Sequence, residues 1–182
     1  MKLAELVELC ERTHRRYHVV GDDSFAVLAA LDVEGRLFAA LDGELVHLVR
    51  TAAFLGTSTR DTYLNPGGDG LWPAPEGSRV GYEYATGTWR VPPGLTGARY
   101  AVLHSTNRSV TIRAEIDLIT SEGLGVPTAF ERDVCLDGQA MVVTETIEYL
   151  GPRELPADRC RLAPWSLAQF TGGPGCVARF PD

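Results

Sequence analysis

The sequence has little clustered positive charge and no long apolar run. Its 182 residues include 17 Lys and Arg against 24 Asp and Glu, for a formal net charge of −7, and Arg15-Arg16 is the only adjacent basic pair. A surface that binds nucleic acid or anionic lipid needs a basic patch, and a membrane span needs about 20 uninterrupted apolar residues. We therefore expect no nucleic-acid or membrane partner.

The sequence also lacks paired metal-ligand or redox spacings. The four cysteines stand far apart, at Cys10, Cys135, Cys160 and Cys176, and form no C-x-x-C motif. The four histidines form neither H-x-H nor H-E-x-x-H. No phosphate-binding loop or nucleophile elbow is present either, so we expect no metal and no cofactor.

Acidic residues interrupt the apolar residues at the N-terminus. Glu5, Glu8 and Glu11 lie where the apolar segment of a signal peptide would have to be. We therefore predict a cytoplasmic protein with reduced thiols.

What the sequence does contain is the composition of one globular domain. Apolar residues make up 45% and charged residues 23%, and about 150 residues per domain is usual. Apolar positions from Leu3 to Tyr17 recur at three- and four-residue steps, which predicts a helix, so we assign residues 1–20 to an N-terminal helix and 21–182 to a β-domain.

Short apolar runs separated by turn residues predict strands throughout the β-domain. The predicted strands are 25–31, 36–41, 44–49, 98–105, 110–119, 129–136, 141–149 and 176–180. Their spacing is typical of an antiparallel β-sandwich rather than an alternating α/β chain. The Gly- and Pro-rich segment from Asn65 to Gly77 is predicted to be a long loop.

Aromatic residues beside polar ones are the best candidates for a binding site. Trp72 lies in a proline-rich segment between Asp69 and Glu76, and rigid aromatic rings next to carboxylates suit sugars. Trp89 and Trp165 have similar surroundings. A single loop tryptophan more often closes the end of the core, but three such segments favour a shared cleft.

The same segments resemble the galactose mutarotase-like superfamily, in a branch related to aldose 1-epimerase. The resemblance rests mainly on Tyr63–Gly77, which reads YLNPGGDGLWPAPEG, with weaker support from Trp89, Glu131-Arg132 and Leu162–Leu167. It implies a large antiparallel sandwich with a sugar-binding cleft. The implied ligand-binding residues are Asp69, Trp72, Glu76, Trp89, Arg90, Trp165, Ser166 and Gln169.

Aldose 1-epimerases use a histidine as general acid and a glutamate as general base, and here the sequence departs from them. The segment Pro164-Trp165-Ser166 contains no histidine, and the glutamate of that family comes from a C-terminal portion that this chain is expected to lack. Without both groups, mutarotation should lose about 10²–10⁴-fold for each. The leading interpretation is thus a carbohydrate-binding module without epimerase activity.

Two alternatives remain open, and one concerns catalysis. The chain could be a sugar-active enzyme with another acid–base pair, for which the candidates are Glu76, His104, Glu131 and Arg132. It could instead be a structural or assembly module. Because the implied sandwich would be incomplete, we also expect either a homodimer that pairs sheet edges or a fragment of a longer protein.

Overall fold

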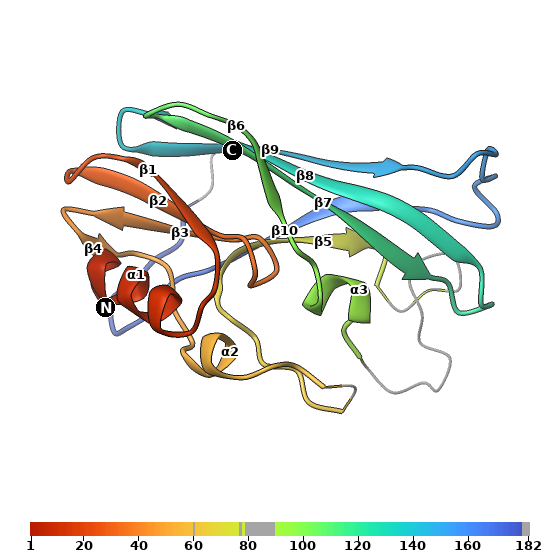
Figure 1. Ribbon diagram of the computed structural model, residues 1–182, viewed down its shortest axis with the longest axis horizontal. Coiled ribbons are helices and arrows are strands. Elements are labelled where there is room, and N and C mark those ends of the chain that lie inside the picture. The colour runs from red at the N-terminus through yellow and green to blue at the C-terminus, as the bar shows by residue number, and fades with distance from the viewer. Residues whose placement is uncertain (60, 77, 79–89, 180–182) are drawn as a thin grey trace.

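The structure, a computed structural model, describes residues 1–59, 61–76, 78 and 90–179. The helices are α1 (Leu3–Arg12), α2 (Ala52–Leu55) and α3 (Pro93–Thr96). The strands are β1 (Tyr17–Gly21), β2 (Phe25–Ala30), β3 (Arg36–Leu41), β4 (Glu44–Leu45), β5 (Gly68–Ala74), β6 (Ala101–Ser105), β7 (Ser109–Ile119), β8 (Gly125–Asp137), β9 (Ala140–Tyr149) and β10 (Ala163–Gln169). The predicted mainly β fold with an N-terminal helix is confirmed (Figure 1).

The strands form two antiparallel sheets. The first has the order β1-β2-β3-β5-β10, with β4 paired to β3, and the second has the order β6-β7-β8-β9. Tight turns connect neighbouring strands: Asp42 and Gly43, between β3 and β4, both have positive φ (47° and 77°). Such a two-residue turn matches the right-handed twist of the strands it joins.

Two apolar cores hold the sheets and the helix together. Ala29 and Leu37 of the first sheet share one core with Ile112 and Phe130 of the second. In β2 and β3 the alternate residues Leu28 and Phe38 belong to a separate core, and the buried α1 residues that pack there are Leu6, Leu9 and Cys10. One face of the first sheet is thus turned to the second sheet and the other to α1.

This division of faces extends to β5 and β10. Leu37 pairs with Asp69, and Leu71 pairs with Ser166, so these residues face the second sheet. The next residue, Trp72, pairs with Trp165, so both tryptophans point to the other face of these strands, while both still pack against the core shared by the two sheets.

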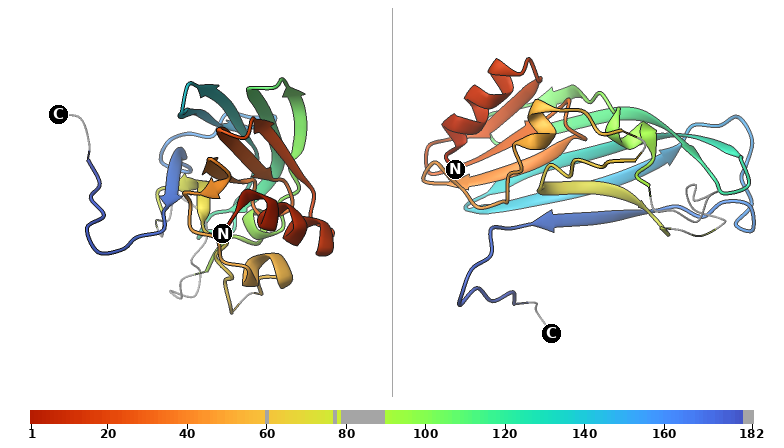
Figure 2. Two further views of the ribbon diagram at one scale, coloured as in Figure 1. Left: turned by 90° about the vertical axis from the view of Figure 1, so that its left-hand side faces the viewer. Right: turned by 90° about the horizontal axis from the view of Figure 1, so that it is seen from below.

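One side of the sandwich is open. Among the described residues, β9 pairs only with β8 and β10 only with β5, and these two edge strands run along the same side (Figure 2). The inward residues of β7 are buried, whereas those of β9, such as Val143 and Ile147, are only half-buried. We call this the open side.

Several element boundaries differ from the predicted ones. The helix ends at Arg12, and Tyr17–Gly21 form β1. His14 adopts a left-handed φ of 54°, which breaks the helix although the apolar spacing continues past it. The strand predicted at 44–49 is regular only at Glu44–Leu45.

The predicted loop and the last predicted strand were also wrong in part. Gly68–Ala74, inside the segment taken as a loop, form β5, and its partner β10 was not predicted. Residues 176–179 form no strand, and the rest of that predicted strand lies outside the described residues.

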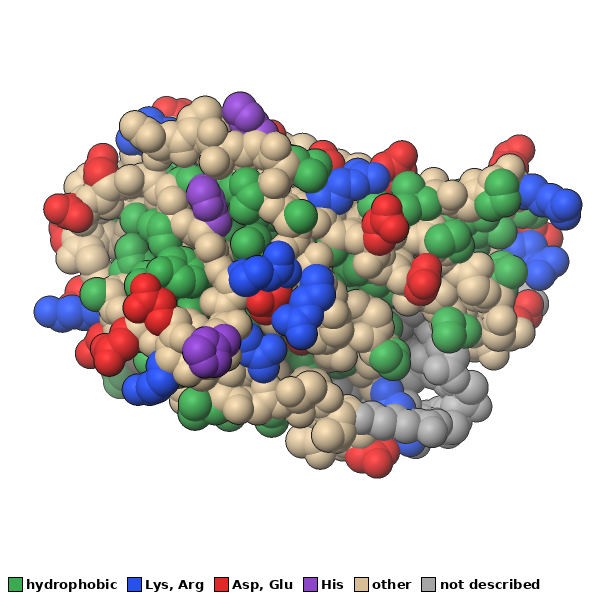
Figure 3. All heavy atoms as spheres, in the orientation of Figure 1, with side chains coloured by type: hydrophobic (Ala, Val, Ile, Leu, Met, Phe, Trp, Pro, Cys, Tyr) green, Lys and Arg blue, Asp and Glu red, His purple; other side chains and the backbone are tan. Residues whose placement is uncertain are grey.

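The described surface mixes both signs of charge. On the face in Figure 3, basic and acidic side chains are interspersed. Arg16 and Arg99, for example, both pair with Asp32, at 2.6 and 3.2 Å. None of the helices in the described part of the chain is long and apolar enough to cross a membrane.

Candidate functional site

A buried arginine joins the two sheets near the open side. Arg132 of β8 is fully buried, and its Nη1 donates hydrogen bonds to the carbonyl oxygens of Gly35 (3.0 Å) and Asp69 (2.8 Å). Its Nη2 contacts the Asp69 carboxylate and lies 2.7 Å from Oε1 of Glu145. Burying an unpaired guanidinium would cost roughly several kcal/mol in lost solvation, so a buried arginine needs carboxylate or carbonyl partners of this kind.

Glu145 connects this buried arginine to the surface. It lies directly opposite Arg132 in the β8–β9 register, and its side chain is 7% exposed. Its other carboxylate oxygen accepts a hydrogen bond from the hydroxyl of Ser166, an exposed residue of β10. The Ser166–Glu145 contact therefore bridges the edge strands of the two sheets at the open side.

The buried His47 lies close enough to Asp69 and Arg132 for their charges to affect its pKa. His47 is 3% exposed, and its Nδ1 accepts a hydrogen bond from the backbone N–H of Ala39 at 2.9 Å. Its ring lies 4.8 Å from that of Phe170. Burial lowers the pKa of His47; the nearby Asp69 charge opposes this effect and the Arg132 charge adds to it.

A second buried charge cluster occupies the other face of the first sheet. Arg36 pairs with Glu34 at 2.9 Å and donates to the hydroxyl of Tyr63, also at 2.9 Å. That hydroxyl in turn donates to Glu34, again at 2.9 Å. Burial and the neighbouring Glu34 charge raise the pKa of Tyr63 well above its usual value, so it remains a donor.

The two predicted site tryptophans lie side by side on this face. The rings of Trp72 and Trp165 are 6.4 Å apart at 85°, and Tyr63 approaches Trp72 edge-on at 5.8 Å. Trp72 is 6% exposed, whereas Trp165 is half-buried. Gln169, on the same face of β10, donates to Asn65 at 3.1 Å.

The predicted binding residues therefore fall into two groups separated by the first sheet. Asp69 and Ser166 lie with Arg132 between the sheets, whereas Trp72, Trp165 and Gln169 lie on the other face. The sequence did not distinguish these faces, because neither β5 nor β10 was predicted as a strand and only strand alternation separates Trp165 from Ser166.

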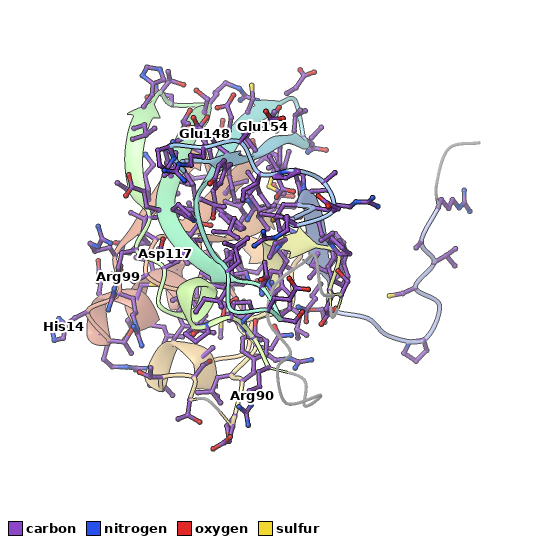
Figure 4. The ribbon with its side chains drawn as sticks, turned by 90° about the vertical axis from the view of Figure 1, so that its right-hand side faces the viewer. His14, Arg90, Arg99, Asp117, Glu148 and Glu154 are labelled. Carbon is purple, nitrogen blue, oxygen red and sulfur yellow. The ribbon has the colours of Figure 1, made fainter. Side chains whose placement is uncertain are left out.

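The remaining predicted residues do not join either group. Arg90 pairs with Asp61 at 3.5 Å, at the lower side of the end view in Figure 4. Glu76 is half-buried beyond the end of β5. Trp89 lies outside the described residues.

The four candidate catalytic residues are likewise dispersed. Glu131 precedes Arg132 in β8, points to the outer face of the second sheet and pairs with Arg113 at 3.2 Å. His104 is exposed on β6, at the far edge of that sheet. The structure therefore does not bring Glu76, His104, Glu131 and Arg132 into one acid–base site.

The sequence interpretation missed Glu145, although β9 carried a signal for it. The inward positions of β9 read Met141, Val143, Glu145, Ile147 and Tyr149. A single carboxylate in an otherwise apolar alternation needs a buried partner, and Arg132 provides it.

The described residues contain no group of three or more His, Cys, Asp or Glu side chains arranged to hold a metal ion. A scan against models of protein families, a search of curated proteins and a search of solved structures each found no match. The candidate site is thus defined by its geometry alone.

Proposed function

We propose that the chain binds a carbohydrate at the open side and does so without aldose-epimerase chemistry. The observation that carries the proposal is the Ser166–Glu145 pair, a hydroxyl and a carboxylate held together at the edge of the sandwich. Sugars are recognised by such groups, because a carboxylate accepts hydrogen bonds from neighbouring hydroxyls while a serine both donates and accepts.

The buried Arg132 supports this proposal by fixing the carboxylate. Glu145 is anchored from below by Nη2 at 2.7 Å, and Arg132 is itself held by two backbone carbonyl groups. A polar group whose position is set in advance loses less conformational entropy when it binds a ligand. The other oxygen of Glu145, Oε2, accepts a hydrogen bond from Ser166. A sugar hydroxyl can replace Ser166 as the donor to this oxygen.

The surroundings of Glu145 favour binding over acid–base catalysis. Proton transfer needs an acid and a base within reach of one substrate. Of the histidines, His47 is buried with Nδ1 occupied by Ala39, and His104 is on another edge. Mutarotation of glucose or galactose, followed by polarimetry, should be no faster with the protein than without it.

A panel of monosaccharides and disaccharides, screened by ¹H–¹⁵N NMR, tests the binding. We expect at least one sugar to shift the amide signals of Glu145 and Ser166. Glu145→Gln and Ser166→Ala should each weaken its binding about tenfold, the loss of one good hydrogen bond.

Glu148→Gln is the matched control, because Glu148 lies on the same strand but on the opposite face, paired with Arg113 at 2.6 Å. It should bind the sugar like the wild type. A panel without any shift would overturn the proposal and favour a structural module. Catalysed mutarotation that Glu145→Gln abolishes would favour an enzyme instead.

A further inference from the structure

An apolar hollow continues the open side beyond the Ser166–Glu145 pair. It has a volume of about 320 Å³ and lies between β8, β9 and the segment after β9. Its apolar lining consists of Val126, Ile147, Tyr149, Leu155, Cys160 and Leu162. Small-molecule sites are commonly of this size and are lined mainly by apolar side chains.

Strand geometry makes the hollow continuous with the polar pair. Ile147 and Tyr149 are on the same face of β9 as Glu145 and follow it by about 7 and about 13 Å along the strand. Leu162 directly precedes β10 and is four residues from Ser166, about 13 Å along an extended chain. The hollow thus begins two residues beyond Glu145 on the same face of β9.

The charged residues around the hollow do not favour a ligand of either charge. Glu154 is the charged residue in its lining, and it is exposed; Figure 4 shows it with Glu148 at the upper side of this end. The same segment carries both signs of charge, namely Arg153, Glu154, Asp158, Arg159 and Arg161. A neutral apolar group fits this environment best, because water in an apolar hollow finds few hydrogen-bond partners.

We propose that the ligand of the open side is a glycoside with an apolar alkyl or aryl aglycone. The sugar hydroxyls contact Glu145 and Ser166, and the aglycone fills the hollow beside Ile147 and Leu155. This inference rests on the proposed carbohydrate binding and specifies its ligand class.

Three probes test the polar pair and the hollow separately: a methyl glycoside of the best sugar in the panel, the matching hexyl glycoside, and hexanol. The hexyl glycoside should bind at least tenfold more tightly than the methyl glycoside, because each buried methylene adds favourable transfer free energy. Leu155→Ser should lower the affinity for the hexyl glycoside to that for the methyl glycoside. Leu150→Ser is the control, since Leu150 lies in the same segment but outside the hollow.

Cys160 gives an independent readout within the hollow. In a Cys135→Ser, Cys176→Ser variant the exposed thiols are gone and Cys10 is buried, so iodoacetamide reports on Cys160. The hexyl glycoside should slow this alkylation at concentrations where the methyl glycoside does not.

The outcomes distinguish the two proposals. Equal affinity for methyl and hexyl glycosides, without protection of Cys160, would overturn the aglycone inference and leave carbohydrate binding standing. Protection of Cys160 by hexanol with no affinity for any glycoside would overturn both, because the hollow would then bind apolar molecules alone.

Discussion

At the scale of single residues, the buried guanidinium of Arg132 contacts three residues, Gly35, Asp69 and Glu145. Arg132→Ala would leave the carboxylates of Asp69 and Glu145 without their counter-charge inside the sandwich. We expect a loss of about 3–5 kcal/mol in the free energy of unfolding, measured by urea denaturation.

Arg113→Ala is the comparison for this change. Arg113 also contacts two carboxylates, those of Glu131 and Glu148, but on the outer face of the second sheet. Solvent-exposed pairs contribute less than about 1 kcal/mol. Similar losses for the two variants would show that Arg132 is not the buried link between the sheets.

His47 makes stability depend on pH. Its pKa in the folded state lies below the ordinary value of 6.5, because burial disfavours the imidazolium. The unfolded chain therefore binds more protons between the two pKa values, and stability rises with pH in that window. The contribution is complete above pH 6.5 and is lost as the pH falls below it.

His47→Asn tests this dependence, since asparagine can still accept the Ala39 N–H but does not titrate. Urea midpoints compared at several pH values between neutral and mildly acidic conditions should fall less steeply for the variant than for the wild type. The same slope in both proteins would mean that other groups cause the acid sensitivity.

At the scale of the elements, the sequence predicted strands whose residues alternate clearly between apolar and polar. It missed strands that form only because a neighbouring strand pairs with them. β7, with Val110, Ile112 and Ala114 on its inner face, follows its period-two pattern and was predicted. β5 contains Gly68, Gly70 and Pro73, residues that normally indicate a loop. For the same reason, the sequence analysis treated binding residues that lie on two faces of the sheet as one group.

Gly68 and Gly70 of β5 allow neighbouring residues of β3 to pack closely against the backbone of β5. A Cβ on Gly70 would lie 2.4 Å from Nη1 of Arg36, and one on Gly68 would lie 2.8 Å from the carbonyl oxygen of Leu37. Sequence alone cannot separate a glycine needed for space from one needed for a turn, because the neighbouring atom belongs to another strand.

Gly70→Ala should therefore destabilise the protein. The added methyl group must displace the buried Arg36 from Glu34 and Tyr63, and overpacking of this kind costs about 1–3 kcal/mol. Gly172→Ala, where a Cβ meets nothing within 4 Å, should be nearly neutral. Thermal unfolding of both variants measures the difference, and an unaffected Gly70→Ala would contradict the close approach.

At the scale of the whole molecule, the open side is a surface suited to self-association. β9 leaves one row of backbone groups without a strand partner among the described residues, and Val142 on its outer face is 51% exposed. Unprotected edges of this kind pair with other strands. We expect a homodimer at high protein concentration, with an interface of at least about 1,200 Å².

Sedimentation velocity over a range of concentrations measures this association. Val142→Lys should shift the protein toward monomer, because a lysine on an edge strand opposes pairing. Leu103→Lys, a similar change at a residue 57% exposed on the other edge strand of that sheet, should not. A wild-type monomer at all concentrations would show that the open side does not recruit a second copy.

The contact between Arg132 and Gly35 joins residues that are 97 positions apart in the chain. β5 likewise obtains its full-length partner only when β10 is available. During synthesis, one edge of β5 therefore stays unpaired until β10 has left the ribosome. Folds dominated by such distant contacts form slowly and are exposed to aggregation meanwhile, so the yield of folded protein should depend on chaperones and on slow expression at low temperature.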